Sequence, residues 1–509
     1  MSAPTMLDAA LAEEASRALE AALAGRPLVS AERFCASMRT LYTGPAPLAA
    51  ARPALAVGCY PGWGETTAGT VLAAEDRTGV RGPAQRHAWA ETVDADAARA
   101  LAALPGPPVI AAWYTTGRLR RWAGRGGTVA AIDGRLRADI EDKAAFDALL
   151  RAAGVPDRMR IPCIRVEGRL PGLAELQRHV GARRLVVQAG ADSGGRGTHF
   201  VDTPADLERA AAMKGPYKVS AFIPGWSSNC TVLSVPAEDG SVAVYVDRPS
   251  HKAVGVAEAG IGPGKSAGND WSKPWPRRAA DELVEAAVRI GVHLWRTRRL
   301  AGLFGLDAIL TPDGQALFNE INVRNQGTTE VSAVNQHLRG VPPFLAAHLT
   351  VLLGGEPRWL PDADTFNHTT LQDASGGSAR SGGGAGEGRA GGPFYLKLRH
   401  RGDGPVRLSG LRGPGVYRPD PAGRLAWVRP GSHPGDADAD LGEVLLASLP
   451  AEEVVCLPGA ELGTAEAVTT SSGPFAAPHR LSAFGTSVLD ALTTHLTPAT
   501  PTSREVTRP

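Results

Sequence analysis

Residues 318–331, FNEINVRNQGTTEV, carry a carboxylate, an amide and a guanidinium two positions apart, at Glu320, Asn322 and Arg324. In a β-strand the side chains alternate between the two faces, so these three would project from the same face. Ile321 and Val323 would point the other way, into a hydrophobic core. Burying polar groups is costly unless they have partners, so the pattern indicates a ligand site.

The segment before this stretch indicates a hairpin. GLFGLDAIL (residues 302–310) is followed by TPDGQ, and Asp-Gly after a proline is a turn signal. With a loop over residues 312–315, Asp307 lies opposite Glu320, where two carboxylates repel each other unless a cation sits between them. With Asn322 as a third oxygen donor, the set suits Mg²⁺, which bridges to phosphate. The alternative is a buried ion pair with Arg324 that only holds the hairpin together.

A glycine-rich stretch, SGGRGTHF at residues 193–200, lies between two apolar segments typical of strands. The phosphate-binding loops of Walker and dinucleotide-binding motifs are followed by a helix, so neither motif fits. A glycine loop between antiparallel strands can fold over phosphates and offer backbone N–H groups, with Arg196 adding charge. The alternative is an ordinary glycine hairpin.

The composition excludes several classes of protein. The 509 residues contain 54 lysines and arginines against 52 aspartates and glutamates, which favours neither nucleic acid nor an anionic membrane as a partner. The five cysteines are scattered without a CxxC pair, which argues against a disulfide framework or a thiolate metal site. The N-terminus is acidic where a signal peptide is basic, and no apolar run approaches about 20 residues. We therefore expect a cytoplasmic protein.

The order of the segments resembles the ATP-grasp superfamily over residues 52–340. A capped helix with Lys143, a strand, the glycine-rich hairpin, the strand VSAFIPG and the D…ExNxR hairpin follow one another as they do in biotin carboxylase, D-alanine–D-alanine ligase and glutathione synthetase. The resemblance implies an α/β fold with an N-terminal Rossmann-like subdomain, a lid subdomain and a small β-rich C-terminal domain. The expected parts are an N-terminal helical segment (1–50), an N-terminal α/β domain (51–138), an ATP-grasp domain (139–360, lid about 157–218), a glycine-rich linker (374–393), a C-terminal α+β domain (394–495) and a disordered tail (496–509).

The resemblance also assigns roles to residues of this chain. The ATP phosphates would contact Lys143, Gln188 and the lid residues Ser193, Gly194, Gly195, Arg196 and Gly197. Ser220, Ala221 and Phe222 would form the hinge that binds the adenine edge. Asp307, Glu320 and Asn322 would hold Mg²⁺, with two ions expected. Arg324 would face the γ-phosphate, so that Arg324, Glu320 and Arg196 are the predicted catalytic residues.

Two positions depart from the superfamily pattern. The strand before the glycine loop usually ends in a lysine, where this chain has Gln188, and the usual acidic pair of the hinge is replaced by Ser220 and Ala221. Glutamine can donate hydrogen bonds but brings no charge. The departures allow weaker ATP affinity, compensation by Arg196 or a nearby lysine, or loss of activity. We favour compensation, because the complete D…ExNxR set is present.

Within the superfamily, RPSHKAVGVAEAG and SAGNDW together with the C-terminal extension look most like the pheganomycin-type peptide ligases. That resemblance implies an ATP- and Mg²⁺-dependent ligase that joins a small amino-acid-like carboxylate to an amine through an acyl phosphate, in natural-product (antibiotic) biosynthesis. The expected partners are small molecules, with a homodimer as an option. His251, Lys252, Asn269 and Asp270 are candidate substrate contacts, or else solvated loop residues. The alternatives are a ligase that loads a carrier-protein thiol and an inactive nucleotide-binding regulatory or scaffold protein.

Overall fold

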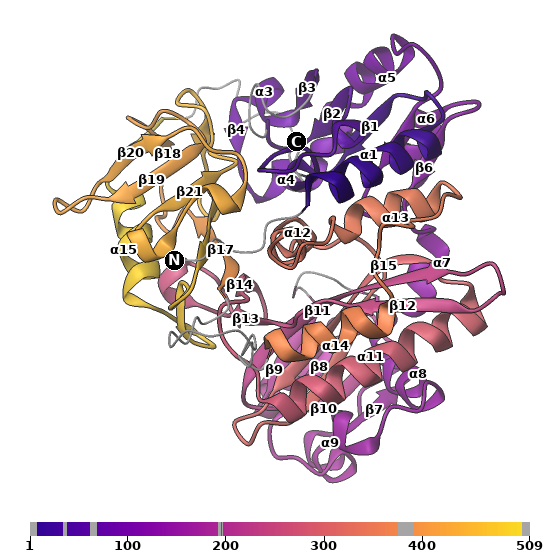
Figure 1. Ribbon diagram of the computed structural model, residues 1–509. Helices are drawn as coiled ribbons and strands as arrows, with labels where there is room; N and C mark the ends of the chain where they lie inside the picture. The colour runs from indigo at the N-terminus through magenta and orange to yellow at the C-terminus, as the bar shows by residue number, and fades with distance from the viewer. Residues whose placement is uncertain are drawn as a thin grey trace, which may run out of the picture.

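Three parts of the chain meet around α12 (Thr329–Leu338) in Figure 1: an N-terminal α/β unit, a central body with its lid, and a C-terminal unit rich in strands. The computed structural model describes residues 8–33, 38–61, 69–191, 195, 197–374 and 391–500. The class is mixed α/β, as the sequence predicts. No helix among these residues has both the length and the apolar character to cross a membrane.

The N-terminal unit contains a five-stranded parallel sheet in the order β3-β2-β1-β5-β6. Its strands are β1 (Leu28–Ala31), β2 (Leu55–Gly58), β3 (Thr70–Ala73), β5 (Val109–Ala111) and β6 (Thr128–Ala130). The middle strand, β1, lies in the segment 1–50 for which the sequence predicts only helix. All four of its residues are buried, as in a central parallel strand, so it shows no alternating pattern. The unit therefore starts before the expected boundary at residue 51.

The helices of the N-terminal unit surround this sheet. α1 (Ala9–Leu23) begins at Asp8, whose carboxylate accepts from the Ala10 backbone N–H, and it buries Leu19 and Leu23 against α13 (Phe344–Leu352). The others are α2 (Arg39–Tyr42), α3 (Ala74–Thr78), α4 (Pro83–Thr92), α5 (Asp94–Ala102), α6 (Gly117–Ala123) and α7 (Gly134–Ile140). Contacts between α1 and α13 tie the N-terminal unit to the central body.

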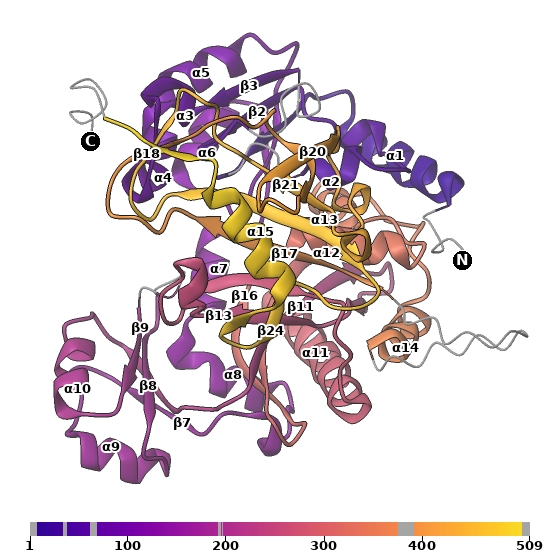
Figure 2. The ribbon, with the colours of Figure 1, turned by 90° about the vertical axis from the view of Figure 1, so that its left-hand side faces the viewer.

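The lid is a four-stranded antiparallel sheet in the order β7-β10-β8-β9. It comprises β7 (Cys163–Val166), α9 (Leu173–Val180), β8 (Leu185–Ala189), β9 (Thr198–Val201), α10 (Pro204–Ala211) and β10 (Tyr217–Ala221). Figure 2 shows this sheet with α9 and α10 standing away from the rest of the molecule. The glycine-rich stretch connects β8 to β9, as the sequence predicts for a hairpin.

One large sheet contains strands of both the central body and the C-terminal unit. Its order is β16-β15-β11-β13-β14-β17-β23-β21-β19-β20, with β12 paired to β11. The strands of the central body are β11 (Trp226–Pro236), β12 (Val242–Val246), β13 (Ser250–Val254), β14 (Ser266–Asp270), β15 (Gly302–Leu310) and β16 (Ala316–Asn322). α11 (Arg277–Arg298) packs on β11, β12 and β16 through an apolar stripe that includes Leu283, Ala287, Ile290 and Leu294. α8 (Phe146–Ala152) and α14 (Ala363–Ala374) complete this body.

The C-terminal strands continue the sheet of the central body. β17 (Gly392–Arg399) pairs with β14, and β23 (Glu461–Thr469), β21 (Val444–Ala447), β19 (Gly415–Pro419) and β20 (Leu425–Arg429) follow across it. The remaining elements are β18 (Val406–Leu408), β22 (Val455–Cys456), β24 (Phe475–Ala477), β25 (Arg480–Leu481), α15 (Ala483–Thr493) and β26 (Leu496–Pro498). β22 also pairs with β4 (Val80–Arg81) of the N-terminal unit. The predicted C-terminal domain is thus an extension of the central sheet.

Two predicted boundaries near the C-terminus differ from those in the structure. The tail predicted to be disordered from residue 496 begins with β26, which pairs with β18. Within the predicted linker 374–393, Ala374 ends α14 and the last two residues begin β17, while residues 375–390 lie outside the described residues. Residues 501–509 of the tail lie outside them as well.

Candidate active site

The β15–β16 hairpin places two carboxylates directly opposite each other. Asp307 pairs with Glu320, as the sequence predicts. Near the turn the register is one residue different, with Leu310 opposite Ala316, and a bulge between Asp307 and Ala308 restores the expected pairing. Ile321 is buried in the core on the other face. The alternation predicted from the sequence is therefore confirmed.

Lysines surround this pair of carboxylates. Lys252 on β13 donates to Asp307 Oδ2 at 2.6 Å, and the amine of Lys143 lies 3.4 Å from Glu320 Oε2. Burial raises the pKa of Asp307, an effect that Lys252 opposes and the charge of Glu320 reinforces. Burial alone would raise the pKa of Glu320, but the positive charges of Lys143 and Lys252 lower it to about 2. The site therefore holds Glu320 as a carboxylate at neutral pH.

Arg324 lies beside this pair and holds its neighbours in place. Its guanidinium donates to Asn322 Oδ1 at 2.6 Å, and its Nε lies 3.1 Å from Glu141 Oε1. The amide of Asn322 faces Glu320 Oε1 at 3.4 Å. The three polar residues of the ExNxR motif thus lie together. Glu141 joins this cluster through Arg324, a contact that the sequence did not indicate.

Asp307 also accepts from a polar side chain of the neighbouring strand. The Asn229 side chain on β11 donates to Asp307 Oδ1 at 2.6 Å and to Gln326 Oε1 at 3.0 Å. Its side-chain oxygen accepts from the Thr328 hydroxyl. These bonds fix the rotamer of Asp307 and connect the hairpin to the loop before α12. No pattern in the sequence singled out Asn229.

Lys218 lies beside the position where the superfamily pattern has lysine. Gln188 on β8 and Lys218 on β10 are directly opposed in the lid sheet. The Lys218 amine donates to the backbone carbonyl of Asn319 at 2.6 Å and to its side-chain oxygen at 3.2 Å, next to Glu320. Burial lowers the pKa of Lys218. A lysine is therefore present on the strand next to Gln188.

The structure describes part of the glycine loop. Ser193, Gly194 and Arg196 lie outside the described residues. Gly195 has a φ of +76° and approaches the backbone of Gly264 so closely that a Cβ would lie 2.5 Å from its carbonyl oxygen. The Gly197 carbonyl accepts from the Ala189 N–H at 2.9 Å.

The hinge residues Ser220, Ala221 and Phe222 lie at the end of β10 or directly after it. The N–H groups of Ala221 and Phe222 donate to the carbonyls of Pro162 and Arg184. The backbone N–H groups of Ala221 and Phe222 are thus already hydrogen-bonded inside the protein.

The four candidate substrate contacts divide between the two faces of the sheet. Lys252 and Asn269 are directly opposed and share the face of Asp307. His251 and Asp270 are opposed on the other face, where the His251 ring packs between Trp226 and Trp275 at centroid distances of 5.3 and 5.7 Å. Burial lowers the pKa of His251 to about 3. The structure therefore corrects the prediction for His251 and Asp270, which are core residues, because strand alternation sends them away from the site.

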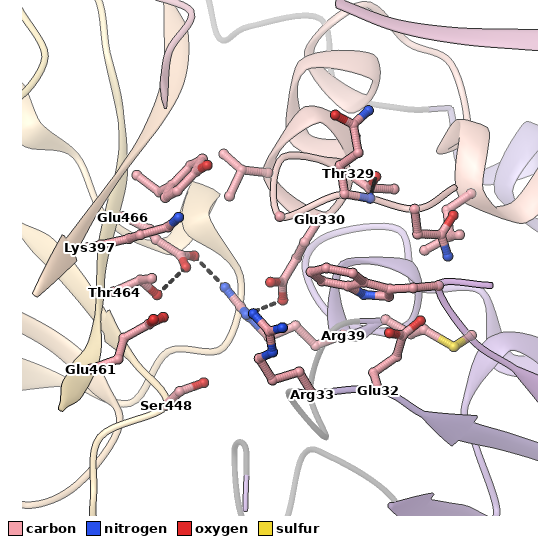
Figure 3. Close-up of a pocket in the computed structure, with 18 of the residues that line it drawn as sticks. Glu32, Arg33, Arg39, Thr329, Glu330, Lys397, Ser448, Glu461, Thr464 and Glu466 are labelled. Atoms are coloured by element: carbon pink, nitrogen blue, oxygen red, sulfur yellow. Dashed lines mark hydrogen bonds and ion pairs between the residues drawn. The ribbon is translucent and has the colours of Figure 1, made fainter. Parts of the chain in front are cut away.

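A pocket opens on the same sheet face, between the C-terminal strands and the N-terminal unit (Figure 3). Lys397 and Glu466 come from β17 and β23, Glu330 from α12, and Arg33 from the loop after β1. Asn269 connects the two regions, because it donates to Ser250 and accepts from the Tyr395 hydroxyl on β17. The sequence could not indicate this pocket, because its walls come from segments hundreds of residues apart.

The oxygen donors at the hairpin fit a divalent cation. Asp307 and Glu320 supply two carboxylates, and the lysine amines that contact them occupy the place of a positive charge. Among the described residues no group of three or more histidine, cysteine, aspartate or glutamate side chains could hold a metal by itself. Mg²⁺ keeps several waters and takes further oxygens from phosphate, so two carboxylates and one amide suffice.

The comparisons with known proteins concern the fold. No protein-family model matches the sequence, and no curated protein matches it. A biotin carboxylase from Campylobacter jejuni, solved as a β-γ-ATP complex, shares 14% identity with a TM-score of 0.52 over 87% of each chain. A phosphoribosylamine–glycine ligase from Thermotoga maritima shares 13% identity with a TM-score of 0.49, over 92% of this chain and 97% of that one. An L-amino acid ligase from Bacillus licheniformis shares 12% identity with a TM-score of 0.44, over 92% and 98%.

The similarity to biotin carboxylase shows that this chain has the ATP-grasp fold. The parallel N-terminal sheet, the antiparallel lid and the carboxylate-bearing hairpin are its elements here. At 14% identity the similarity shows the fold alone, so the chemistry has to be inferred from the site.

Proposed function

We propose that this protein is an ATP- and Mg²⁺-dependent ligase that joins a carboxylate to an amine. The observation that carries the proposal is the opposed pair Asp307 and Glu320. Lys252 contacts Asp307, Lys143 contacts Glu320, and Lys218 of the lid donates to Asn319 in the adjoining bulge. Transfer of a phosphoryl group depends on positioning and on neutralising charge, and these are the residue types that it needs.

The proposed reaction has two steps. The substrate carboxylate attacks the γ-phosphorus of ATP, the bond to the β–γ bridging oxygen breaks, and ADP leaves with that electron pair. The amine nitrogen then attacks the acyl phosphate carbon, the carbon–oxygen bond to phosphate breaks, and the nitrogen loses a proton. Arg324 stabilises the transferring phosphoryl group and the activated carboxylate by charge.

Each residue predicted to bind ATP or Mg²⁺ has a part in this proposal. Mg²⁺, as one or two ions held by Asp307, Glu320 and Asn322, would neutralise charge on the phosphates. Lys143, with Lys218 beside Gln188, would contact the phosphates, and Ser193, Gly194, Gly195, Arg196 and Gly197 would close over them. Ser220, Ala221 and Phe222 would border the adenine. Because Asn322 is held by Arg324 here, both would change partners when ATP binds.

Lys218 weighs against the inactive alternative. A chain that had lost its chemistry would have no need for a buried lysine beside Gln188, where burial makes the charged amine costly. The finer proposal is a peptide ligase of natural-product biosynthesis with small amino-acid-like substrates. It rests on the resemblance in residues 248–260 and 266–271 and in the C-terminal extension.

The test is Mg²⁺-dependent ADP release from the purified chain. Amino acids and short peptides are supplied in pairs, and ADP is measured together with the condensed product by mass spectrometry. We expect ADP and product in equal amounts for at least one pair and none when Mg²⁺ is chelated. ATP binding without ADP release in any mixture would contradict the proposal and favour a regulatory protein.

A further inference from the structure

The carboxylate of Glu461, which lines the pocket of Figure 3, lies among four positive side chains, and three of these, Arg33, Arg86 and Lys397, also line the pocket. Arg86 lies 3.2 Å and Arg399 3.9 Å from Glu461 Oε2, and the charge of Glu461 also acts on Arg33 and Lys397. Among the residues that the structure describes, the buried Nε atoms of Arg86 and Arg399 have no hydrogen-bond partner. The carboxylate of Glu461 thus interacts electrostatically with all four cations.

The other acids of the pocket do not balance this charge. Arg39 forms ion pairs with both Glu330 and Glu466. Burial raises the pKa of Glu330 to about 8, and burial likewise raises the pKa of Glu32 well above its ordinary value. Burial thus favours the uncharged form of both carboxyl groups, and Glu461 is the carboxylate whose charge acts on both Arg33 and Lys397.

The Lys397 amine is the best placed of the cations to meet a ligand. It points into the pocket from the C-terminal strands, and Arg33 enters from the N-terminal unit (Figure 3). Among the described residues neither side chain forms an ion pair within 4 Å, although Arg33 faces the Trp113 ring at 5.5 Å. Burial lowers the pKa of Lys397 to about 8, and the charges of Arg399, Lys252 and Arg86 contribute to the shift. A bound anion would relieve this repulsion.

We propose that Lys397 and Arg33 bind a carboxylate of the amine substrate that takes no part in the reaction, so that this substrate is an amino acid or short peptide with a free carboxylate. The proposal rests on the ligase function proposed above and adds a substrate class and a subsite to it. The subsite is built by the C-terminal extension, which supplies Lys397 from β17.

The position of β17 explains why this carboxylate is not the reacting one. Four strand spacings separate β15, which carries Asp307, from β17, which carries Lys397. At about 4.8 Å each they amount to roughly 19 Å across the sheet. Lys397 lies four residues beyond the position of β17 in register with Asp307, which adds roughly 13 Å along the strand and gives a separation of about 23 Å. Long side chains at both ends cover part of that span, and two or three extended residues of about 3.4 Å each cover the rest. The anchored carboxylate and the reacting centre therefore belong to opposite ends of one short substrate.

The first experiment compares free acids with amides. Di- and tripeptides are supplied as amine substrates in the ADP-release assay, each as the free acid and as the C-terminal amide. We expect a KM at least 10-fold higher for the amide with kcat changed little, because the anchored group is remote from the chemistry. Equal KM values for acid and amide would overturn the proposal.

The second experiment uses variants of the lysine. Lys397→Met should raise KM for the free acid at least 10-fold and remove the difference between acid and amide, whereas Lys214→Met on the exposed lid surface should change neither. KM for the free acid should rise above pH 8, as the amine loses its proton, and Lys397→Arg should abolish that rise while keeping the preference for the acid. An unchanged KM in a folded Lys397→Met protein would contradict the assignment.

A third measurement separates this proposal from the ligase function. Trinitrobenzenesulfonate labels lysine amines, and labelling of Lys397 is followed by peptide mass spectrometry without ATP. We expect the free peptides to slow it at least 3-fold and their amides to have no effect. This result without any ADP release would keep the subsite and reject the ligase. If only inorganic phosphate slowed the labelling of Lys397, or if no peptide slowed it, the carboxylate subsite would be rejected whatever the activity.

Discussion

Lys218 is the residue that most changes the interpretation of the sequence. The strand before the glycine loop has glutamine at position 188, and only the pairing of β8 with β10 reveals a lysine across from it. Gln188 also donates to Thr198 at 3.3 Å, while its carbonyl oxygen has no partner in the described part of the chain. The superfamily pattern has one lysine at this position, which supplies both a charge and hydrogen bonds. In this chain Lys218 carries the charge, and Gln188 can only form hydrogen bonds.

This division of roles predicts the behaviour of Lys218→Met. We expect ATP affinity to fall at least 10-fold, a loss of about 1.4 kcal/mol, because the variant lacks a charge that we propose faces the phosphates. The melting temperature should stay within a few degrees or rise, because a buried cation is removed. Isothermal titration with ATP and a thermal melt on the same preparation provide both values.

Adding Gln188→Lys to Lys218→Met should restore most of the ATP affinity, since it returns a charge one strand away. Gln188→Lys alone should lower the melting temperature, because two ammonium groups would then be directly opposed. Unchanged ATP affinity in Lys218→Met would show that this lysine has only a structural role.

At the scale of elements, the close approach of β14 and β17 makes one sheet of two units. Gly268 on β14 has a φ of +152°, and a Cβ there would lie 2.0 Å from the Tyr395 carbonyl oxygen and 2.9 Å from Phe475 Cζ. Tyr395 and Lys397 follow on β17, so this contact sets the position of the proposed subsite.

Gly268→Ala should therefore destabilise the protein strongly, by about 3 kcal/mol or more, because neither the backbone angle nor the space suits a side chain. Gly404→Ala is the matched control: no atom lies within 4 Å of a Cβ built there, so its unfolding midpoint should match that of the wild type. Urea denaturation of both variants gives the measurement. A Gly268→Ala protein as stable as the control would contradict the continuous sheet.

Local patterns predict part of this fold and site, and long-range pairing decides the rest. The alternation of Glu320, Ile321 and Asn322 and the turn before them give the hairpin and its carboxylate pair correctly. The same alternation, applied to His251 and Asp270, would have shown that they face away from Lys252. The pairing of β14 with β17 depends on residues more than a hundred positions apart, and no turn signal or periodicity encodes it.

At the scale of the whole molecule, three units contribute to one polar surface. The lid carries Lys218, the central hairpin carries Asp307 and Glu320, and the C-terminal extension carries Lys397. The N-terminal unit closes the pocket with Arg33 and Arg39, and the ion pairs of Arg39 to Glu330 and Glu466 hold this unit against α12 and β23. The proposed ligase depends on the assembly of these residues from different units around one face of the large sheet.

The measurement that tests the central claim most directly is Mg²⁺-dependent ADP release by Glu320→Gln, with Glu285→Gln on the exposed side of α11 as the control. Removing one negative charge from the carboxylate pair should reduce turnover at least ~100-fold, about 2.7 kcal/mol of transition-state stabilisation. The Mg²⁺ concentration for half-maximal activity should rise, and the control should match the wild type. A folded Glu320→Gln protein that releases ADP at the wild-type rate and Mg²⁺ dependence, even with a lower melting temperature from the lost contact with Lys143, would show that the hairpin is structural and would contradict the account.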